Sequence, residues 1–187
     1  MRPPKIIKPY VKAFARQIIR TNGDVDLYYI ECTPLQGLPK GECFPIVEEH
    51  AKANGGCGVL GWAIWERPKV FIEAELHMVW ETPDKTLKDI ATRQAPTRRI
   101  LFLRDPNRRY DGRQMDNVRK ALTHDKDVKH FLSLFQRKHR LWNEGELADY
   151  HGDMADEITP EMIKIEEEIA MFEMKITQRY GIWMPEA

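Results

Sequence analysis

The chain has 187 residues, which is enough for one domain with a hydrophobic core and some peripheral helix. Hydrophobic residues make up 42% of it and charged residues 31%, a composition typical of a globular protein and not of a disordered or fibrous one. The formal net charge is zero, so the overall charge does not draw the chain toward nucleic acid or a membrane surface.

The sequence contains no recognisable targeting or membrane-spanning segment. Residues Met1 to Lys5 lack the apolar run of a signal peptide, and no later segment approaches the ~20 apolar residues of a membrane span. We therefore expect a cytoplasmic protein, or one exported by a route that needs no such signal. The three cysteines, Cys32, Cys43 and Cys57, form no Cys-x-x-Cys pair, so reduced thiols are expected and a disulfide framework is not.

The first part of the chain is predicted to contain a helix, a strand and a loop. Apolar residues at helical spacing predict the helix from Pro9 to Asn22, with Asn22-Gly23 as its end. Leu27 to Ile30 is rich in residues that favour strands. The next segment, 33–41, contains two prolines and two glycines and is predicted to be a loop.

A second helix is predicted from Phe44 to Asn54. Pro45 fits its first turn, where a missing amide proton is not needed, and the glycines after Asn54 end it. Cys43 therefore lies at the N-terminus of a helix. The unpaired amide groups and the helix dipole favour a thiolate there, which is a common way to make a cysteine nucleophilic near neutral pH.

Two long strands follow, from Val59 to Glu66 and from Val70 to Glu81, joined by a turn at 67–69. Alternation in the second strand places His77 on a mostly polar face, together with Glu73 and Glu75.

The chain is then predicted to double back, because Thr82-Pro83-Asp84 is typical of a turn. If Glu81 pairs with Lys85, His77 lies directly opposite Asp89, with Cβ atoms about 5 Å apart. A slip of one residue would instead put His77 and Asp89 on opposite faces of the sheet.

The remaining predicted elements are a strand from Arg99 to Leu103, an amphipathic helix from Asp127 to Trp142, and a last helix that opens at Thr159-Pro160 and ends near Tyr180-Gly181. Together the elements indicate an α+β protein with a mostly antiparallel sheet. We expect a single domain, 1–187, with a core at about 24–105 and a C-terminal helical extension at about 125–187.

Cys43, His77 and Asp89 supply the three groups that covalent acyl transfer needs: a thiol nucleophile, an imidazole base and a carboxylate that orients the base. Each of them alone more often has a structural role, and a lone cysteine near a helix start is usually a small buried hydrophobe. Their order and context, on a helix start, a strand and the adjoining strand, favour the catalytic interpretation.

Four short motifs carry a resemblance to a known family: Gly41-Glu42-Cys43-Phe44, the glycine-marked strand that ends at Gly61-Trp62, His77-Met78-Val79-Trp80 and Asp89-Ile90-Ala91-Thr92. In about a third of its length the chain resembles the transglutaminase-like branch of the papain-like cysteine enzymes. The resemblance implies a papain-like core in which Cys43 is the nucleophile, His77 the general base and acid, and Asp89 the residue that orients His77. Two features depart from the family pattern, since its commoner His-Ala-Trp is longer here by one residue and Phe44 stands where tryptophan is frequent.

The same resemblance suggests residues that contact the oxyanion or the substrate. Gln36 precedes Cys43 by seven positions and is similar to the glutamine that helps bind the oxyanion in papain-like enzymes. Trp62 and Trp80 lie within the shared motifs and are the other candidates. The backbone amide of Cys43 is a further donor, because amides at a helix start point toward developing negative charge.

A zinc site is the competing chemical interpretation, with ligands drawn from Cys32, Cys43, Cys57, His50 and His77. Zinc ligands usually come in pairs two to four residues apart, and this chain has no such pair among its cysteines. We therefore expect no metal and no other cofactor. Gly55-Gly56-Cys57-Gly58 precedes a strand and not a helix, which argues against a phosphate-binding loop.

A binding protein without catalytic activity is the alternative of a different class. Six arginines near Tyr110 form a basic segment that suits nucleic acid or an acidic protein partner: Arg98, Arg99, Arg104, Arg108, Arg109 and Arg113. The zero net charge and the acidic C-terminal region weigh against it. The function we expect is a cysteine hydrolase or acyltransferase that acts on an amide or isopeptide bond of a protein or peptide, by hydrolysis, deamidation or transglutamination.

Overall fold

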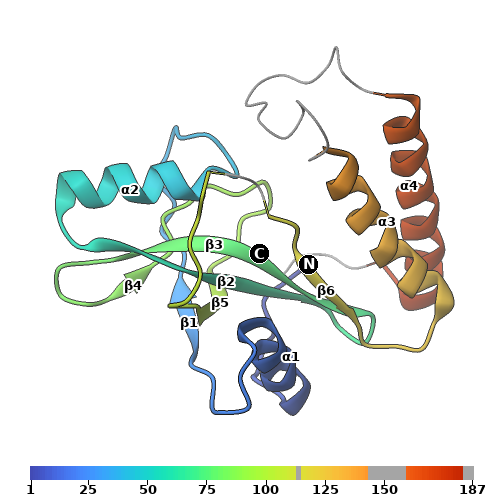
Figure 1. The fold of residues 1–187 in the computed structure, drawn as a ribbon, viewed down its shortest axis with the longest axis horizontal. Helices are drawn as coiled ribbons and strands as arrows, with labels where there is room; N and C mark the ends of the chain where they lie inside the picture. Colours follow the sequence, from blue (N-terminus) through green and yellow to red (C-terminus); the bar gives the residue numbers. More distant parts are fainter. Residues whose placement is uncertain (113–114, 143–158, 183–187) are drawn as a thin grey trace.

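The computed structural model of this protein describes residues 1–112, 115–142 and 159–182. In these ranges it is an α+β fold with four helices and one six-stranded sheet, whose strands all pair in antiparallel fashion (Figure 1). The helices are α1 (Pro9–Ile19), α2 (Cys43–Asn54), α3 (Lys126–Trp142) and α4 (Pro160–Tyr180). The strands are β1 (Leu27–Glu31), β2 (Cys57–Arg67), β3 (Phe71–Glu81), β4 (Leu87–Lys88), β5 (Arg99–Arg104) and β6 (Val118–Ala121).

The predicted helices and the long hairpin are confirmed, with two differences. Helix α1 ends at Ile19, before Asn22-Gly23, because Arg20 adopts a left-handed conformation with φ 53° and its amide bonds to Arg16. Strand β6 falls in a segment for which no strand was predicted. Its sequence, Val-Arg-Lys-Ala, carries no strand signal of its own, and it forms because the edge of β3 at Phe71–Ala74 offers free backbone groups.

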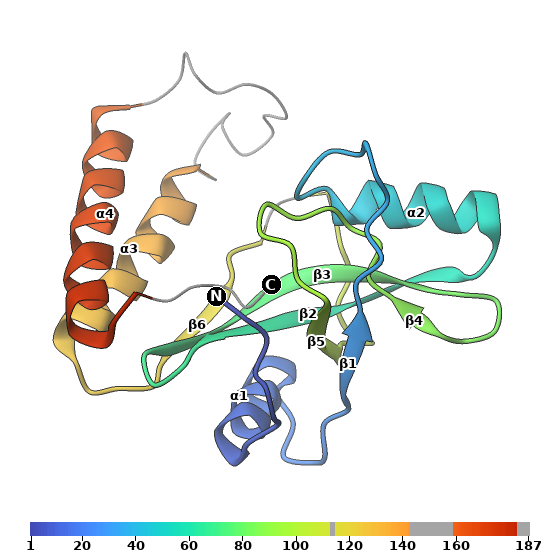
Figure 2. The same ribbon diagram turned by 180° about the vertical axis from the view of Figure 1, so that it is seen from behind.

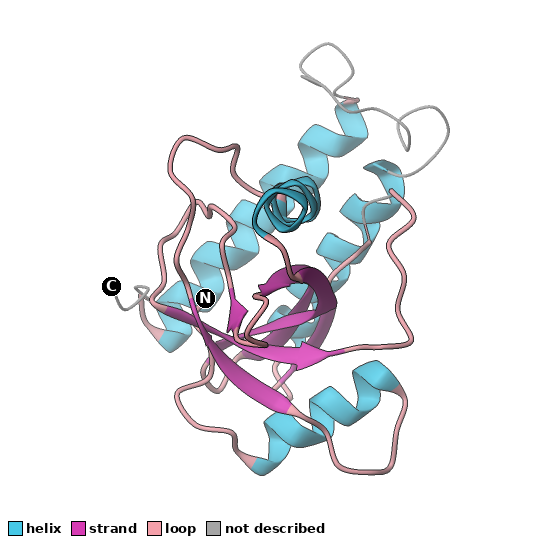
Figure 3. Ribbon diagram, turned by 90° about the vertical axis from the view of Figure 1, so that its left-hand side faces the viewer, coloured by secondary structure: helices cyan, strands magenta, loops and turns pink. Residues whose placement is uncertain are grey.

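The β2–β3 hairpin is the centre of the sheet, whose strand order is β1-β5-β2-β3-β4 with β6 also on β3. The sheet lies between α1 and α2 in all views (Figures 1 and 3). Ala74 packs in the core under α1, whereas Met78, on the same strand face, packs under α2. Strands β2 and β3 are 11 residues long, and their right-handed twist turns the same face of β3 toward α1 at one end and toward α2 at the other.

Helices α3 and α4 form a hairpin that packs at the far end of β2 and β3, away from α2 (Figure 2). Val70 and Phe71 meet Phe131 and Ile176 there in a core of their own. Beside it, the Arg67 side chain bonds to three groups of the α4 end: Glu173 at 2.8 Å, the Thr177 hydroxyl at 3.1 Å and the Gly181 carbonyl at 3.1 Å. In the described part of the chain, no helix combines the length and apolar character needed to cross a membrane.

Candidate active site

The loop before α2 and the segment after β4 are joined by backbone hydrogen bonds. Thr33 donates to Asp89 at 2.8 Å, Leu35 to Ile90 at 3.1 Å and Gly41 to Thr92 at 3.2 Å. The loop that leads into α2 therefore runs along the segment that contains Asp89. This arrangement explains how a helix start and a distant aspartate come together beside β3.

The turn after β3 lies at the predicted Thr82-Pro83-Asp84, but the strand pairing beyond it differs from the one assumed. Glu81 pairs with Leu87 and not with Lys85, so Asp89 lies beside Val79 and diagonal to His77. The expected register is thus wrong by two residues. The strands pair two residues further along the chain because Thr82 and Thr86 bond to each other across the turn. Lys85, within the turn, takes a left-handed conformation with φ 67°.

A shift of two residues keeps each side chain on its face, since alternation along a strand has a period of two. His77 and Asp89 therefore still share a face, and His77 Nε2 lies 2.9 Å from Asp89 Oδ1. This face of β3 was expected to be mostly polar, and two of its polar residues are in fact buried: His77 is 1% exposed and Glu73 6%.

Asp89 is fully buried and accepts several hydrogen bonds. Its Oδ1 accepts from His77 and from the Ala91 amide, and its Oδ2 accepts from Arg93 Nη2 at 3.0 Å and from the Cys32 thiol at 3.5 Å. Burial raises the pKa of Asp89, but the charges and hydrogen bonds of His77 and Arg93 lower that pKa by more, to well below its usual range. Asp89 is therefore ionised at neutral pH.

His77 is held in its charged form by Asp89 and Cys43. Burial lowers its pKa, whereas the charge and hydrogen bond of Asp89 and a hydrogen bond with Cys43 raise it, to about 9. The charge of Arg93 acts in the lowering direction. Because Nε2 faces Asp89, Nδ1 is the ring nitrogen that remains for Cys43. The structure thus brings Cys43, His77 and Asp89 together.

Cys43 begins α2 and is 5% exposed. Its neighbour Phe44 stacks on Tyr110, with ring centroids 3.7 Å apart, so the loop after β5 covers the helix start. The other two cysteines differ in their surroundings. Cys57 is exposed, and Cys32 is half-buried against Asp89, where burial first and the carboxylate second raise the pKa of its thiol to about 12.

The three residues expected to contact oxyanion or substrate are placed apart from one another. Gln36 is exposed in the loop before α2. Trp62 is 1% exposed in the core under α1 and donates to Asp105 at 3.0 Å. Trp80 packs on His50 and donates to the Gly55 carbonyl at 2.9 Å, at the opposite end of α2 from Cys43. The roles of Gln36, Trp62 and Trp80 stay predictions.

Arg93 is the site residue that the sequence analysis missed. It contacts both His77 and Asp89, and it follows Asp89 by four positions. The only feature of the sequence that links Arg93 to Asp89 is their separation of four residues. Such a separation brings two side chains together on a helix, but Arg93 lies on an irregular segment.

Within the described residues, no group of three or more histidine, cysteine or acidic side chains is arranged to hold a metal ion. In the predicted basic segment, two arginines lie over aromatic rings of this chain, Arg99 at 4.1 Å from Tyr29 and Arg108 at 5.4 Å from Trp62. Arg98, Arg104 and Arg109 are exposed, and Arg113 lies outside the described residues. Binding to nucleic acid or an acidic protein stays a prediction.

No family model, curated protein or solved structure is detectably similar to this chain. The resemblance to transglutaminase-like enzymes therefore depends on the four motifs alone.

Proposed function

We propose that this protein is a cysteine hydrolase or acyltransferase that acts on an amide or isopeptide bond of a protein or peptide. The observation that carries the proposal is the buried chain of contacts from Cys43 to His77 to Asp89. We also propose that α2, β2 and β3 form a transglutaminase-like, papain-like core, since the four motifs fall on these elements and on the segment after β4.

In the proposed reaction, Cys43 and His77 start as a thiolate–imidazolium pair, with the proton of Cys43 already on the ring, and the thiolate attacks the carbonyl carbon of the amide. The negative charge that develops on the carbonyl oxygen is stabilised by the backbone amide of Cys43 at the start of α2. The carbon–nitrogen bond then breaks as His77 returns the proton to the leaving amine. Water resolves the thioester in hydrolysis and a second amine resolves it in acyl transfer, and either step regenerates the thiol.

The charge state of the site supports this mechanism. Asp89 is ionised and His77 favours its protonated form at neutral pH, so a Cys43 thiolate has a cation beside it. The diagonal contact between His77 and Asp89 also keeps Nδ1 directed toward Cys43. A structural cysteine in an apolar pocket would have neither feature.

The test is alkylation with iodoacetamide, followed by peptide mapping at a series of pH values. Exposure alone predicts that Cys57 reacts first and Cys43 last, because Cys57 is exposed and Cys43 is buried. The proposal predicts the reverse at about pH 6, with Cys43 labelled at least about tenfold faster than Cys57. His77→Gln should remove this advantage. Labelling of Cys57 ahead of Cys43 at every pH would overturn the proposal.

Acylation provides a second measurement that depends on chemistry and not only on a reactive thiol. We expect p-nitrophenyl acetate to add one acetyl group to the wild-type protein, as seen by intact mass, and to release p-nitrophenolate in a burst. Cys43→Ser should abolish the thioester, whereas Cys57→Ser should leave it unchanged. An acetyl group that persists in Cys43→Ser would contradict the assignment of Cys43 as nucleophile.

A further inference from the structure

We propose that Arg93 is a positioning residue for His77, which fixes the imidazole ring and decides which ring nitrogen carries the proton when the ring is neutral. The geometric part of this inference stands by itself, and its consequence for Cys43 rests on the proposed function.

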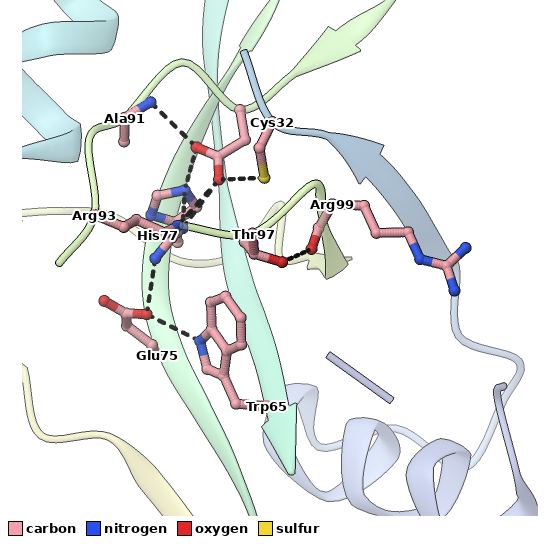
Figure 4. Close-up of polar contacts among 9 residues, drawn as sticks. Cys32, Trp65, Glu75, His77, Ala91, Arg93, Thr97 and Arg99 are labelled. Carbon is pink, nitrogen blue, oxygen red and sulfur yellow. Dashed lines mark hydrogen bonds and ion pairs between the residues drawn. The ribbon is translucent and has the colours of Figure 1, made fainter. Parts of the chain in front are cut away.

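Arg93 is itself held in place by several groups (Figure 4). Its Nη2 donates to Asp89 Oδ2 at 3.0 Å, and its Nη1 to Glu75 Oε2 at 3.4 Å. The guanidinium carbon lies 5.0 Å from the centre of the Trp65 ring, and Trp65 Nε1 donates to Glu75 at 3.0 Å. The side chain is 15% exposed. A guanidinium fixed from three sides has little freedom to move away from His77.

The contact between Arg93 and His77 constrains the proton on the ring. Arg93 Nη2 lies 2.9 Å from His77 Nε2, which is hydrogen-bond distance, and an arginine has only donors to offer. Nε2 therefore accepts this bond only when it carries no proton. When Nε2 does carry a proton, it donates to Asp89 and faces the guanidinium as a second donor.

The His77 ring therefore has a charged and a neutral state, and Arg93 influences which proton is lost between them. The charged ring has protons on both nitrogens and is stabilised by Asp89. When the charged ring loses a proton, the guanidinium can bond to a bare Nε2 and so favours loss from that atom. The neutral ring then keeps its proton on Nδ1, the nitrogen that faces Cys43. His77 would thereby remain a hydrogen-bond donor to the sulfur, whereas proton transfer to a leaving amine uses the charged ring.

The other groups that face His77 do not substitute for Arg93. Asp89 attracts the proton to Nε2, which is the opposite effect. Glu75 lies behind Arg93 and pairs with it. Cys43 lies at the other ring nitrogen, and the Cys32 thiol, with its pKa raised to about 12, stays neutral. In the group formed by Asp89, Arg93, Glu75, Cys43 and Cys32, Arg93 is the one cation beside the ring.

The test is ¹⁵N NMR of the protein labelled at histidine, with the His77 signals assigned from His77→Gln. Each ring nitrogen has a shift that reports its proton, so pKa and tautomer are read independently of any reaction. We expect the neutral wild-type ring to carry its proton on Nδ1. In Arg93→Met the proton should move to Nε2 and the pKa of His77 should rise by about one unit or more, because a positive charge is lost.

Arg93→Lys serves if Arg93→Met does not fold. A lysine keeps the charge but lacks the planar fork that contacts Asp89 and His77 together, so the tautomer should change while the pKa rises by less than in Arg93→Met. Arg99→Met is the matched control, since Arg99 also stacks on an aromatic ring but points away from this cluster (Figure 4). An unchanged tautomer and pKa in every folded Arg93 variant would overturn the inference.

Adding guanidinium ions to a variant without the Arg93 side chain tests whether Arg93 acts on His77 through its charge or through packing. Arg93 lines a cavity of about 290 Å³ together with Trp65, Glu73 and Glu75, so a small cation has a route to the vacated position in Arg93→Ala. Millimolar guanidinium should restore the wild-type His77 tautomer in this variant, and urea should not. Equal effects of both compounds would contradict a role for the charge.

These measurements distinguish the inference from the proposed function. If Cys43 fails to label ahead of Cys57 but the His77 shifts depend on Arg93, the proposed function fails and the inference stands. If Cys43 labels as proposed but the ¹⁵N shifts of His77 are the same in the Arg93 variants as in the wild type, only the inference fails.

Discussion

His77 Nε2 lies 2.9 Å from Asp89 Oδ1 although the β3–β4 pairing places Asp89 beside Val79 and not beside His77. The two side chains meet along a diagonal of the sheet, a separation that long side chains bridge easily. The diagonal approach leaves Asp89 Oδ2 available to Arg93 and Cys32. One carboxylate thus orients a histidine and anchors an arginine at the same time.

Asp89→Asn should slow labelling of Cys43 at neutral pH. The charge of Asp89 and its hydrogen bond raise the pKa of His77, so removing the charge lowers that pKa and leaves His77 neutral near pH 7. We expect iodoacetamide labelling of Cys43 to fall about tenfold or more at pH 7 and to recover at high pH, as measured by peptide mapping. Asp84→Asn, on the exposed turn, is the control that should label like the wild type.

The stability of the protein should depend on the titration of His77. Its pKa is raised from 6.5 to about 9 on folding, so its contribution is fully present below pH 6.5 and is lost as the pH rises through about 9. We expect the free energy of unfolding in urea to fall by about 1–3 kcal/mol more for the wild type than for His77→Gln between pH 6 and pH 10. Parallel curves for the two proteins would refute this linkage.

Gly61→Ala should destabilise the sheet beside His77. Gly61 is the direct partner of His77 in the β2–β3 hairpin, and a Cβ there would lie 2.2 Å from the Leu103 carbonyl and 2.5 Å from the Phe102 ring. Because a backbone atom blocks the space, we expect a loss of about 1–3 kcal/mol in denaturant unfolding. Gly23→Ala has its nearest neighbour at 3.5 Å and should stay within about 0.5 kcal/mol of the wild type.

Arg67→Met should loosen the attachment of α4 to the sheet. The Arg67 side chain is 6% exposed and bonds to Glu173, Thr177 and Gly181, so its removal leaves these acceptors without their donor. We expect a loss of about 1–3 kcal/mol in urea unfolding and faster amide hydrogen exchange in α4. Arg16→Met breaks only exposed contacts, an ion pair with Asp24 and a hydrogen bond to the Gly23 carbonyl, and should cost less than about 0.5 kcal/mol. A cost equal to that of Arg67→Met would contradict the anchoring role.

The sequence by itself determined the main elements and the helix-start position of Cys43. Alternation together with an assumed pairing of Glu81 with Lys85 also put His77 and Asp89 on one face, and the observed pairing, shifted by two residues, leaves that face unchanged. These features depend on neighbours in the sequence, which a pattern of residue types records.

Only the tertiary structure decided the diagonal contact of His77 with Asp89, the formation of β6 and the placement of Arg93. Each of these depends on groups distant in the sequence: the loop before α2 that bonds to the Asp89 segment, the free edge of β3, and the cluster of Trp65 and Glu75 that fixes the guanidinium. Such contacts are set by the packing of the whole chain, and local periodicity carries no record of them.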